Sequence, residues 1–130
     1  MSGEANLSGR RVLVVEDEYY QADDVARALG GAGGEVMGLC PDEESARAVL
    51  EKQRPDAVVL DVNLGSGPTF KLAETLEARG IPFVFFTGYD QATIPRQFDH
   101  VERLEKPVEP RKIVRAISKV VPNPSSPIHL

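Results

Sequence analysis

Five polar side chains stand where short apolar stretches of this 130-residue sequence come to an end. They are Glu16, Asp17, Asp61, Thr87 and Lys106. Apolar stretches without alternation are typical of strands buried on both faces, as in a parallel sheet. In open α/β sheets, ligands bind at the carboxyl edge of the strands. The positions of these residues therefore suit chemistry better than stability.

Brought together, these carboxylates, the hydroxyl and the amine would suit chemistry at phosphorus. Two carboxylates about 4 Å apart repel each other by about 4 kcal/mol at an effective dielectric constant of about 20, so the cluster needs positive charge. The Lys106 ammonium supplies one charge, and hard oxygen ligands suit Mg²⁺, which keeps several waters for a phosphate group. A carboxylate beside Mg²⁺ can attack phosphorus, while the amine and the Thr87 hydroxyl offset charge on the transferring group.

The segments between these residues alternate between strand-like runs and amphipathic helical patterns. This alternation predicts βαβ units with right-handed crossovers, and therefore an α/β fold: a three-layer αβα sandwich around a five-stranded parallel sheet. The predicted strands span residues 10–16, 35–40, 56–61, 81–87 and 99–105. The predicted helices span residues 19–29, 69–79 and 110–121, and a further helix begins after a capping residue at position 42.

A flavodoxin-like strand order of 2-1-3-4-5 would bring all five polar residues to one edge of the sheet. Pro95 interrupts residues 91–98, so we expect the fourth helix to be short or irregular. Val101 and Leu104 are the only strong apolar residues of the fifth strand, which should therefore lie at an edge of the sheet.

The composition favours one cytoplasmic domain. With 42% hydrophobic and 27% charged residues, the chain is ordinary for a soluble globular protein. Its net charge of −5 disfavours binding to nucleic acid or to anionic membranes. The single cysteine excludes an internal disulfide framework, and no stretch resembles a signal peptide or a membrane span. We expect a domain over residues 10–121, between a flexible N-terminal segment, 1–9, and a flexible tail, 122–130.

Several other conspicuous side chains are expected to serve only packing. Tyr19, Tyr20, Phe83 and Phe85 should be packing residues, and Cys40 should be a small buried hydrophobe. None of these residues receives a functional assignment from its type or spacing.

In their order and spacing, the polar residues resemble the signature of bacterial response-regulator receiver domains, over roughly residues 10–121. The resemblance implies that Asp61 accepts a phosphoryl group from a phosphohistidine on a sensor histidine kinase or a histidine phosphotransfer protein. It also implies that Thr87 and Lys106 contact the phosphoryl group and that the Lys106-Pro107 peptide is cis. The matching motifs are Glu16-Asp17, Asp61, Thr87-Gly88 and Lys106-Pro107.

The same resemblance implies a Mg²⁺ site, held by Glu16, Asp17, Asp61 and the main-chain carbonyl of Asn63. Such a domain is a phosphoacceptor rather than an enzyme with independent turnover. Its output would pass through contacts with a downstream protein, or it would draw phosphate away from another regulator. We expect a monomer or weak homodimer without nucleic-acid or membrane partners.

Residues 85–89 are similar to the FAT GUY subgroup of receiver domains, named for its Phe-Ala-Thr-Gly-x-Tyr motif. Here Phe86 replaces the alanine, and no residue intervenes before Tyr89. Receiver domains usually carry an aromatic residue three positions before the lysine, where this sequence has Arg103. Because the usual threonine-aromatic switch cannot operate unchanged, we hypothesise that Tyr89 and the segment after it report phosphorylation instead.

Two functions of other classes stay open at this point. A haloacid-dehalogenase-like phosphatase would share Asp61, Thr87 and Lys106, but it needs a second Asp where Asn63 stands. A receiver-like binding module that is never phosphorylated would not need the intact set of polar residues. A flavodoxin is disfavoured, because the acidic residues 16–18 would repel a bound phosphate group.

Overall fold

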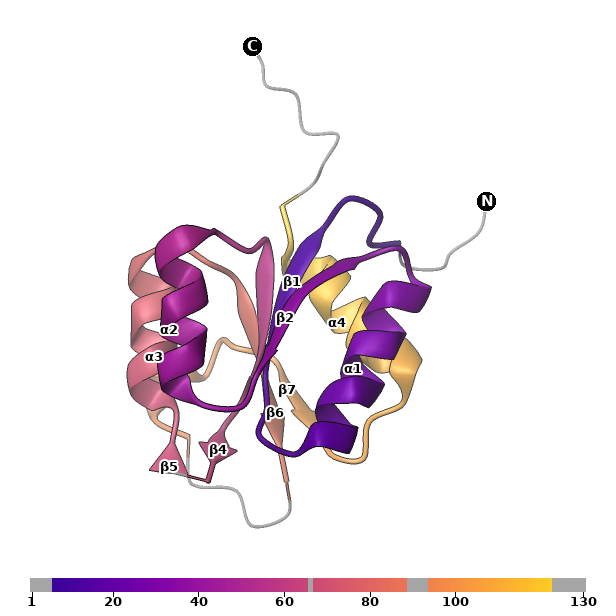
Figure 1. Ribbon diagram of the computed structural model, residues 1–130. Helices are drawn as coiled ribbons and strands as arrows, with labels where there is room; N and C mark the ends of the chain where they lie inside the picture. Colours follow the sequence, from indigo (N-terminus) through magenta and orange to yellow (C-terminus); the bar gives the residue numbers. More distant parts are fainter. Residues whose placement is uncertain (1–5, 66, 89–93, 123–130) are drawn as a thin grey trace.

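A five-stranded sheet forms the middle layer of the protein (Figure 1). The computed structural model describes residues 6–65, 67–88 and 94–122. The order of the strands in this sheet confirms the predicted order of 2-1-3-4-5. Every neighbouring pair of strands is parallel, as predicted. In spatial order the strands are β2 (Glu35–Cys40), β1 (Arg11–Val15), β3 (Ala57–Asp61), β6 (Phe83–Thr87) and β7 (Arg103–Glu105).

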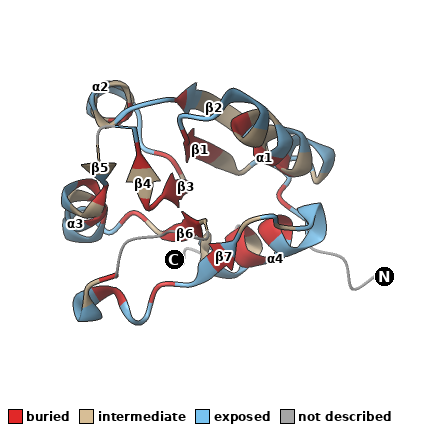
Figure 2. Ribbon diagram, turned by 90° about the horizontal axis from the view of Figure 1, so that it is seen from below, coloured by how far each residue is buried: buried red, intermediate tan, exposed pale blue. Residues whose placement is uncertain are grey.

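Helices cover both faces of the sheet and complete the predicted three-layer sandwich. Figure 2 shows the buried strands between the two helical layers. The strands β1, β3 and β6 point their side chains into two apolar clusters, one under each pair of helices. None of the described helices is both long and apolar enough to cross a bilayer. One pair is α1 (Tyr19–Gly31) with α4 (Pro110–Val120), and the other is α2 (Glu43–Lys52) with α3 (Phe70–Ala78).

Local signals set several helix ends as predicted. The Asp42 side chain caps α2 by accepting a hydrogen bond from the Ser45 N–H at 2.7 Å. Pro110 is the first residue of α4, where its missing N–H leaves no helical bond unmade. Gly33, just beyond α1, has a φ of 93°, a left-handed conformation that glycine adopts without strain.

The region between β6 and α4 departs most from the predicted elements. Strand β7 spans only 3 residues, because the turn that follows a short 3-10 helix, η1 (Arg96–Phe98), occupies the first part of the predicted strand. Phe98 is fully buried, and its ring stacks on Phe70 with centroids 6.0 Å apart. This anchor holds the segment against α3 and leaves β7 short. The predicted edge position of this strand is confirmed.

A small antiparallel hairpin after β3 was not predicted. Its strands are β4 (Asn63–Leu64) and β5 (Gly67–Pro68). Gly67 has a φ of 129°, which a residue with a Cβ adopts only under strain. The chain that follows Asp61 is therefore a closed loop rather than a simple turn.

Three side chains near the N-terminus lie elsewhere than expected. Tyr19 and Tyr20 are 64% and 73% exposed, so the prediction that they are packing residues is wrong. They occupy the first turn of α1, whose buried stripe begins only at Ala22. Leu7 is fully buried and its N–H donates to the Ala32 carbonyl at 2.9 Å, so the packed domain begins before residue 10. Residues 1–5 and 123–130, within the segments predicted to be flexible, lie outside the described residues.

Candidate functional site

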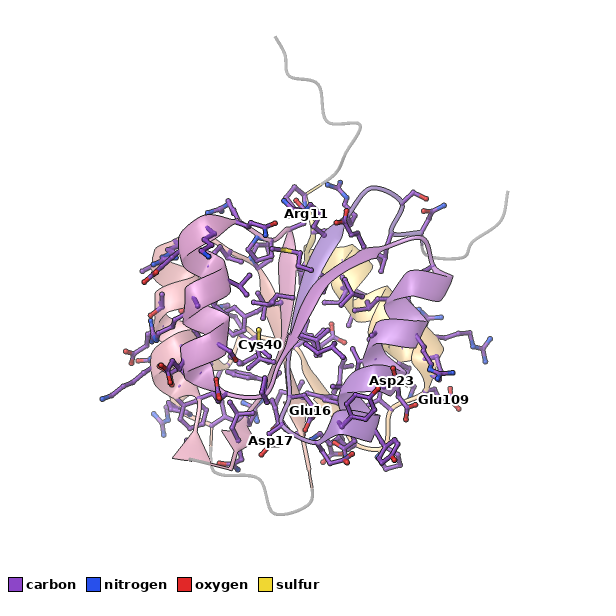
Figure 3. The ribbon with its side chains drawn as sticks, viewed as in Figure 1. Arg11, Glu16, Asp17, Asp23, Cys40 and Glu109 are labelled. Carbon is purple, nitrogen blue, oxygen red and sulfur yellow. The ribbon has the colours of Figure 1, made fainter. Side chains whose placement is uncertain are left out.

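One ammonium group joins two buried carboxylates at the carboxyl edge of the sheet. Lys106 Nζ lies 2.9 Å from Glu16 Oε1 and 2.9 Å from Asp61 Oδ2. The Glu16 and Asp61 side chains are only 1% and 6% exposed. Figure 3 shows Glu16 and the exposed Asp17 together, where β1 gives way to α1. The structure thus brings four of the five predicted residues together.

Hydrogen bonds fix the turn that carries Glu16. Its N–H donates to the carbonyl of Cys40 at 3.0 Å, and its Oε2 accepts from the Glu18 N–H at 3.0 Å. Glu18 in turn caps α1, since its carboxylate accepts from the Gln21 N–H at 3.0 Å. The Glu16 carboxylate cannot swing toward water without breaking this arrangement.

The Asp61 carboxylate is held through both of its oxygens. Oδ1 accepts from the Asn63 N–H at 2.9 Å, while Oδ2 accepts from Lys106. Strand β3 pairs with β1 on one side and β6 on the other, so its end lies in the middle of the sheet edge. This is the place where open α/β sheets bind ligands. The fold therefore orients the carboxylate before any ligand arrives.

Lys106 reaches the pocket from the turn after β7. Its own N–H donates to the Thr87 carbonyl at 2.7 Å, and the Lys106–Pro107 peptide is cis, as predicted. The ammonium lies 4.9 Å from the centroid of the Phe86 ring. An aromatic face attracts a cation at this distance, so Phe86 helps to keep the ammonium in the pocket.

Crowding and burial shift the pKa values of the pocket. The pKa of Glu16 is raised to about 7, mainly by burial and also by the neighbouring Asp61, although the contact with Lys106 acts in the opposite direction. Burial alone would lower the pKa of Lys106, but its contacts with Glu16 and Asp61 outweigh burial, and this pKa is raised. Burial raises the pKa of Glu16 because a charged carboxylate is costly to keep away from water. One ammonium thus leaves the acidic cluster short of positive charge.

The donor set fits a magnesium ion. Glu16, Asp17 and Asp61 each offer a carboxylate oxygen, and these oxygens lie within 4.8 Å of one another. Glu16 Oε1 is buried and lacks an aligned hydrogen-bond donor in the described part of the chain, so its contact with Lys106 is electrostatic. The acids border a cavity of about 250 Å³ that Asn63 also lines. Hard oxygen ligands with space for retained waters are what Mg²⁺ prefers.

Thr87 is the predicted residue that does not join this cluster. It is 1% exposed, and its Oγ1 has no hydrogen-bond partner among the residues that the structure describes. It borders a separate groove between β7 and α4. In that groove the Arg103 side chain is 41% exposed and lies 3.6 Å from Asp99. Tyr89, our candidate for the missing switch aromatic, lies outside the described residues.

Sequence reasoning missed a residue that contacts the main chain of Asp61. The Thr69 hydroxyl donates to the Asp61 carbonyl at 2.7 Å. The sequence placed Thr69 only at the start of a helix, where a threonine ordinarily indicates a cap. No local signal pointed to the strand end eight positions earlier.

A sequence model described as the response regulator receiver domain matches residues 12–118 of this chain. The chain belongs to the response regulator receiver domain family. Receiver domains bind Mg²⁺ at their acidic pocket and interact with histidine kinases or phosphotransfer proteins. Membership of this family and the acidic pocket favour neither the phosphatase nor the unphosphorylated binding module.

Relatives of known name agree with this assignment. The receiver domain is 32% identical over 113 residues to the sensory transduction protein LytT of Bacillus subtilis (strain 168), covering 84% of this chain and 47% of LytT. The chain spans about half the length of the curated relatives that it matches. The solution structure of SdrG from Sphingomonas melonis Fr1 matches with a TM-score of 0.72 and 32% identity, covering 90% of this chain and 98% of SdrG. The crystal structure of the response regulator PhyR from Brucella abortus matches with a TM-score of 0.73 and 25% identity, covering 89% of this chain and 49% of PhyR.

Proposed function

We propose that this receiver domain accepts a phosphoryl group on Asp61 from a phosphohistidine, in a reaction that depends on Mg²⁺. The observation that carries the proposal is the Lys106 ammonium, which lies 2.9 Å from the carboxylates of both Asp61 and Glu16. A fixed cation beside an acceptor carboxylate supports phosphoryl transfer, because it can stabilise charge on the incoming group without reorganising.

In the transfer, a carboxylate oxygen of Asp61 attacks phosphorus while the phosphorus–nitrogen bond of the phosphohistidine breaks. The bonding pair leaves with the imidazole, which takes up a proton from solvent, and Asp61 becomes an acyl phosphate. Lys106 then exchanges its contact with Asp61 Oδ2 for one with a phosphoryl oxygen. The buried Thr87 hydroxyl donates to another phosphoryl oxygen and so gains a partner.

The metal site of the proposal consists of the Glu16, Asp17 and Asp61 carboxylates and the main-chain carbonyl of Asn63. Mg²⁺ supplies positive charge that offsets the charge of the phosphoryl oxygens when it is bound there. The support for this assignment is the spacing of the three carboxylate oxygens, within 4.8 Å of one another, and the excess of acids over ammonium groups in the pocket.

Intact-mass measurement after incubation with acetyl phosphate and Mg²⁺ tests the acceptor. We expect a single phosphoryl adduct that hydroxylamine removes, that EDTA prevents, and that the variant Asp61→Asn does not form. Steady release of phosphate by the protein would instead support a phosphatase. An unchanged mass for the wild type under these conditions would support the passive binding module.

The exposed aromatic residues at the start of α1 support docking of the phosphohistidine protein beside the pocket. Tyr19 and Tyr20 are 64% and 73% exposed, and they follow Glu18, which lines the same cavity as Asp61. The first turn of α1 lies beside the pocket, since Glu18 and Gln21 line it, so a donor whose phosphorus reaches Asp61 comes close to these rings. Replacing both tyrosines by alanine should slow transfer from a phosphorylated histidine kinase while leaving acetyl phosphate labelling unchanged.

We infer that the phosphorylated domain signals through contacts with a downstream protein, or acts as a phosphate sink, without turnover of its own. The groove between β7 and α4 supports the first route, since Thr87 borders it together with the basic residues Arg103 and Arg115. A pulldown with phosphorylated wild type and with Asp61→Asn separates the two routes. Size-exclusion chromatography of the same samples tests the expected monomer or weak homodimer.

A further inference from the structure

The Thr69 hydroxyl is bonded to the main chain of the proposed acceptor residue. Thr69 is 1% exposed, and its Oγ1 donates to the Asp61 carbonyl at 2.7 Å and lies 3.2 Å from the Val62 carbonyl oxygen. The Thr69 N–H also donates to the Val62 carbonyl, at 2.9 Å. One residue thus closes the loop that starts at Asp61.

This threonine stands at the N-cap of α3 but does not cap the helix. Its side chain makes no capping hydrogen bond, whereas Glu18 and Asp42 both accept from N–H groups of the helices they precede. A threonine at this position is ordinarily favoured because its oxygen accepts such a bond and stabilises the helix. The hydroxyl of Thr69 therefore serves the loop before it rather than the helix after it.

The loop that Thr69 closes carries groups that face the pocket. The Asn63 N–H donates to Asp61 Oδ1 at 2.9 Å, and Asn63 is itself paired with Pro68 in the β4–β5 hairpin. A Cβ on Gly65 would lie 3.2 Å from Asp17 Oδ2, which is tighter than an ordinary contact. The loop is thus packed between Thr69 at its base and Asp17 at the pocket.

We infer that Thr69 is a positioning residue for phosphoryl acceptance. Its hydroxyl fixes the described residues of this loop, 61–65 and 67–69, and through them it sets the Asp61 carboxylate and the main chain of Asn63. Thr69 is not among the residues that line the pocket, so it acts through the groups that it holds. The inference rests on the proposed function, because it describes how the same site is prepared.

Three variants separate positioning from stability. Thr69→Val removes the hydroxyl and keeps the shape, and Thr69→Ser keeps the hydroxyl. Thr75→Val is the matched control, because Thr75 lies in α3 and its hydroxyl donates to the Lys71 carbonyl at 3.2 Å. Each protein is assayed for its rate of labelling by acetyl phosphate at saturating Mg²⁺, for its Mg²⁺ dissociation constant by amide chemical shifts, and for its melting temperature.

Loss of the hydroxyl at position 69 should slow labelling about tenfold and weaken Mg²⁺ binding several-fold, the loss expected for one buried hydrogen bond. Thr69→Ser and Thr75→Val should stay within about twofold of the wild type in both readouts. The melting temperature reports stability alone, so the inference is judged by the contrast in labelling rate and Mg²⁺ affinity.

The inference is overturned if folded Thr69→Val is labelled at the wild-type rate and binds Mg²⁺ with wild-type affinity. Thr69→Ala provides a second hydroxyl-free variant in case the valine does not fold. Failure of both to give a native circular dichroism spectrum also overturns it, because the hydroxyl then supports the fold and not the site. If the wild type itself forms no adduct, the proposed function fails, and the Mg²⁺ titrations alone decide the role of Thr69.

Discussion

The two sides of the pocket differ in how far they are assembled. On the side of β1 and β3, Glu16 and Asp61 are buried and share the Lys106 ammonium at 2.9 Å. On the side of β6 and β7, Thr87 is equally buried, but its Oγ1 has no partner within the described residues. Arg103, in the place of the usual aromatic, points to the surface beside it.

The difference follows from the cost of leaving each kind of group unpaired. An uncompensated buried carboxylate is strongly destabilising, so a fold with two of them must also deliver a cation. A neutral hydroxyl without a partner costs only about 1–3 kcal/mol, which a domain can tolerate. The acidic side therefore receives its ammonium as soon as the chain folds, whereas the Thr87 hydroxyl has no partner in the described structure and is free for the bond to a phosphoryl oxygen that we propose.

Replacing Lys106 by methionine should have the largest effect on stability. The change leaves Glu16 and Asp61 buried without a cation, a loss that costs about 3 kcal/mol or more. Urea unfolding in EDTA measures it. The control Lys112→Met removes an exposed lysine of α4 and should change the unfolding free energy by less than about 0.5 kcal/mol. A Lys106→Met protein as stable as the wild type would mean that the acidic side is not held by its ammonium.

The pH dependence of the metal-free protein sharpens the same comparison. Burial raises the pKa of Glu16 from 4.5 to about 7, so the folded state binds more protons than the unfolded state between these values. Stability from this group is therefore fully present below about pH 4.5 and is lost as the pH rises to about 7. Glu16→Gln cannot titrate and should flatten this part of the stability profile. Parallel profiles for the two proteins would contradict the assignment.

The sequence sufficed for the strand order and for the acidic side because both depend on local patterns. Buried strands end at Val15 and Asp61, and parallel topology carries those ends to one edge. The cation was also predictable, since repulsion among the acids demands one.

The features that the sequence did not predict depend on contacts between distant segments. Thr69 carries a capping signature, yet its hydroxyl bonds to a strand end. Tyr19 and Tyr20 fit a helical pattern that gives no information on where the sheet stops covering α1. The lack of a partner for Thr87 likewise becomes visible only once the neighbouring strands are placed.

Addition of Mg²⁺ should stabilise the protein through the acidic side. At a free concentration ten times the dissociation constant, a ligand that binds only the folded state contributes about 1.4 kcal/mol. Thermal or urea unfolding with Mg²⁺ and with EDTA measures this gain, which Asp17→Asn should largely remove. Asp23→Asn is the control, because Asp23 pairs with Arg27 on α1 at 2.7 Å. Equal stabilisation of both variants would place the ion elsewhere.

Replacing Thr87 by valine should have the smallest effect on stability and the opposite sign. The side chains have nearly the same shape, and valine removes a buried hydroxyl that has no partner in the described structure. We therefore expect the unfolding free energy to rise by about 1 kcal/mol, while labelling by acetyl phosphate slows because a donor to the phosphoryl group is lost. Thr87→Ser keeps the hydroxyl, so it should neither gain unfolding free energy nor lose the full labelling rate. A Thr87→Val protein less stable than the wild type would show that this hydroxyl is already bonded, and the contrast between the two sides of the pocket would disappear.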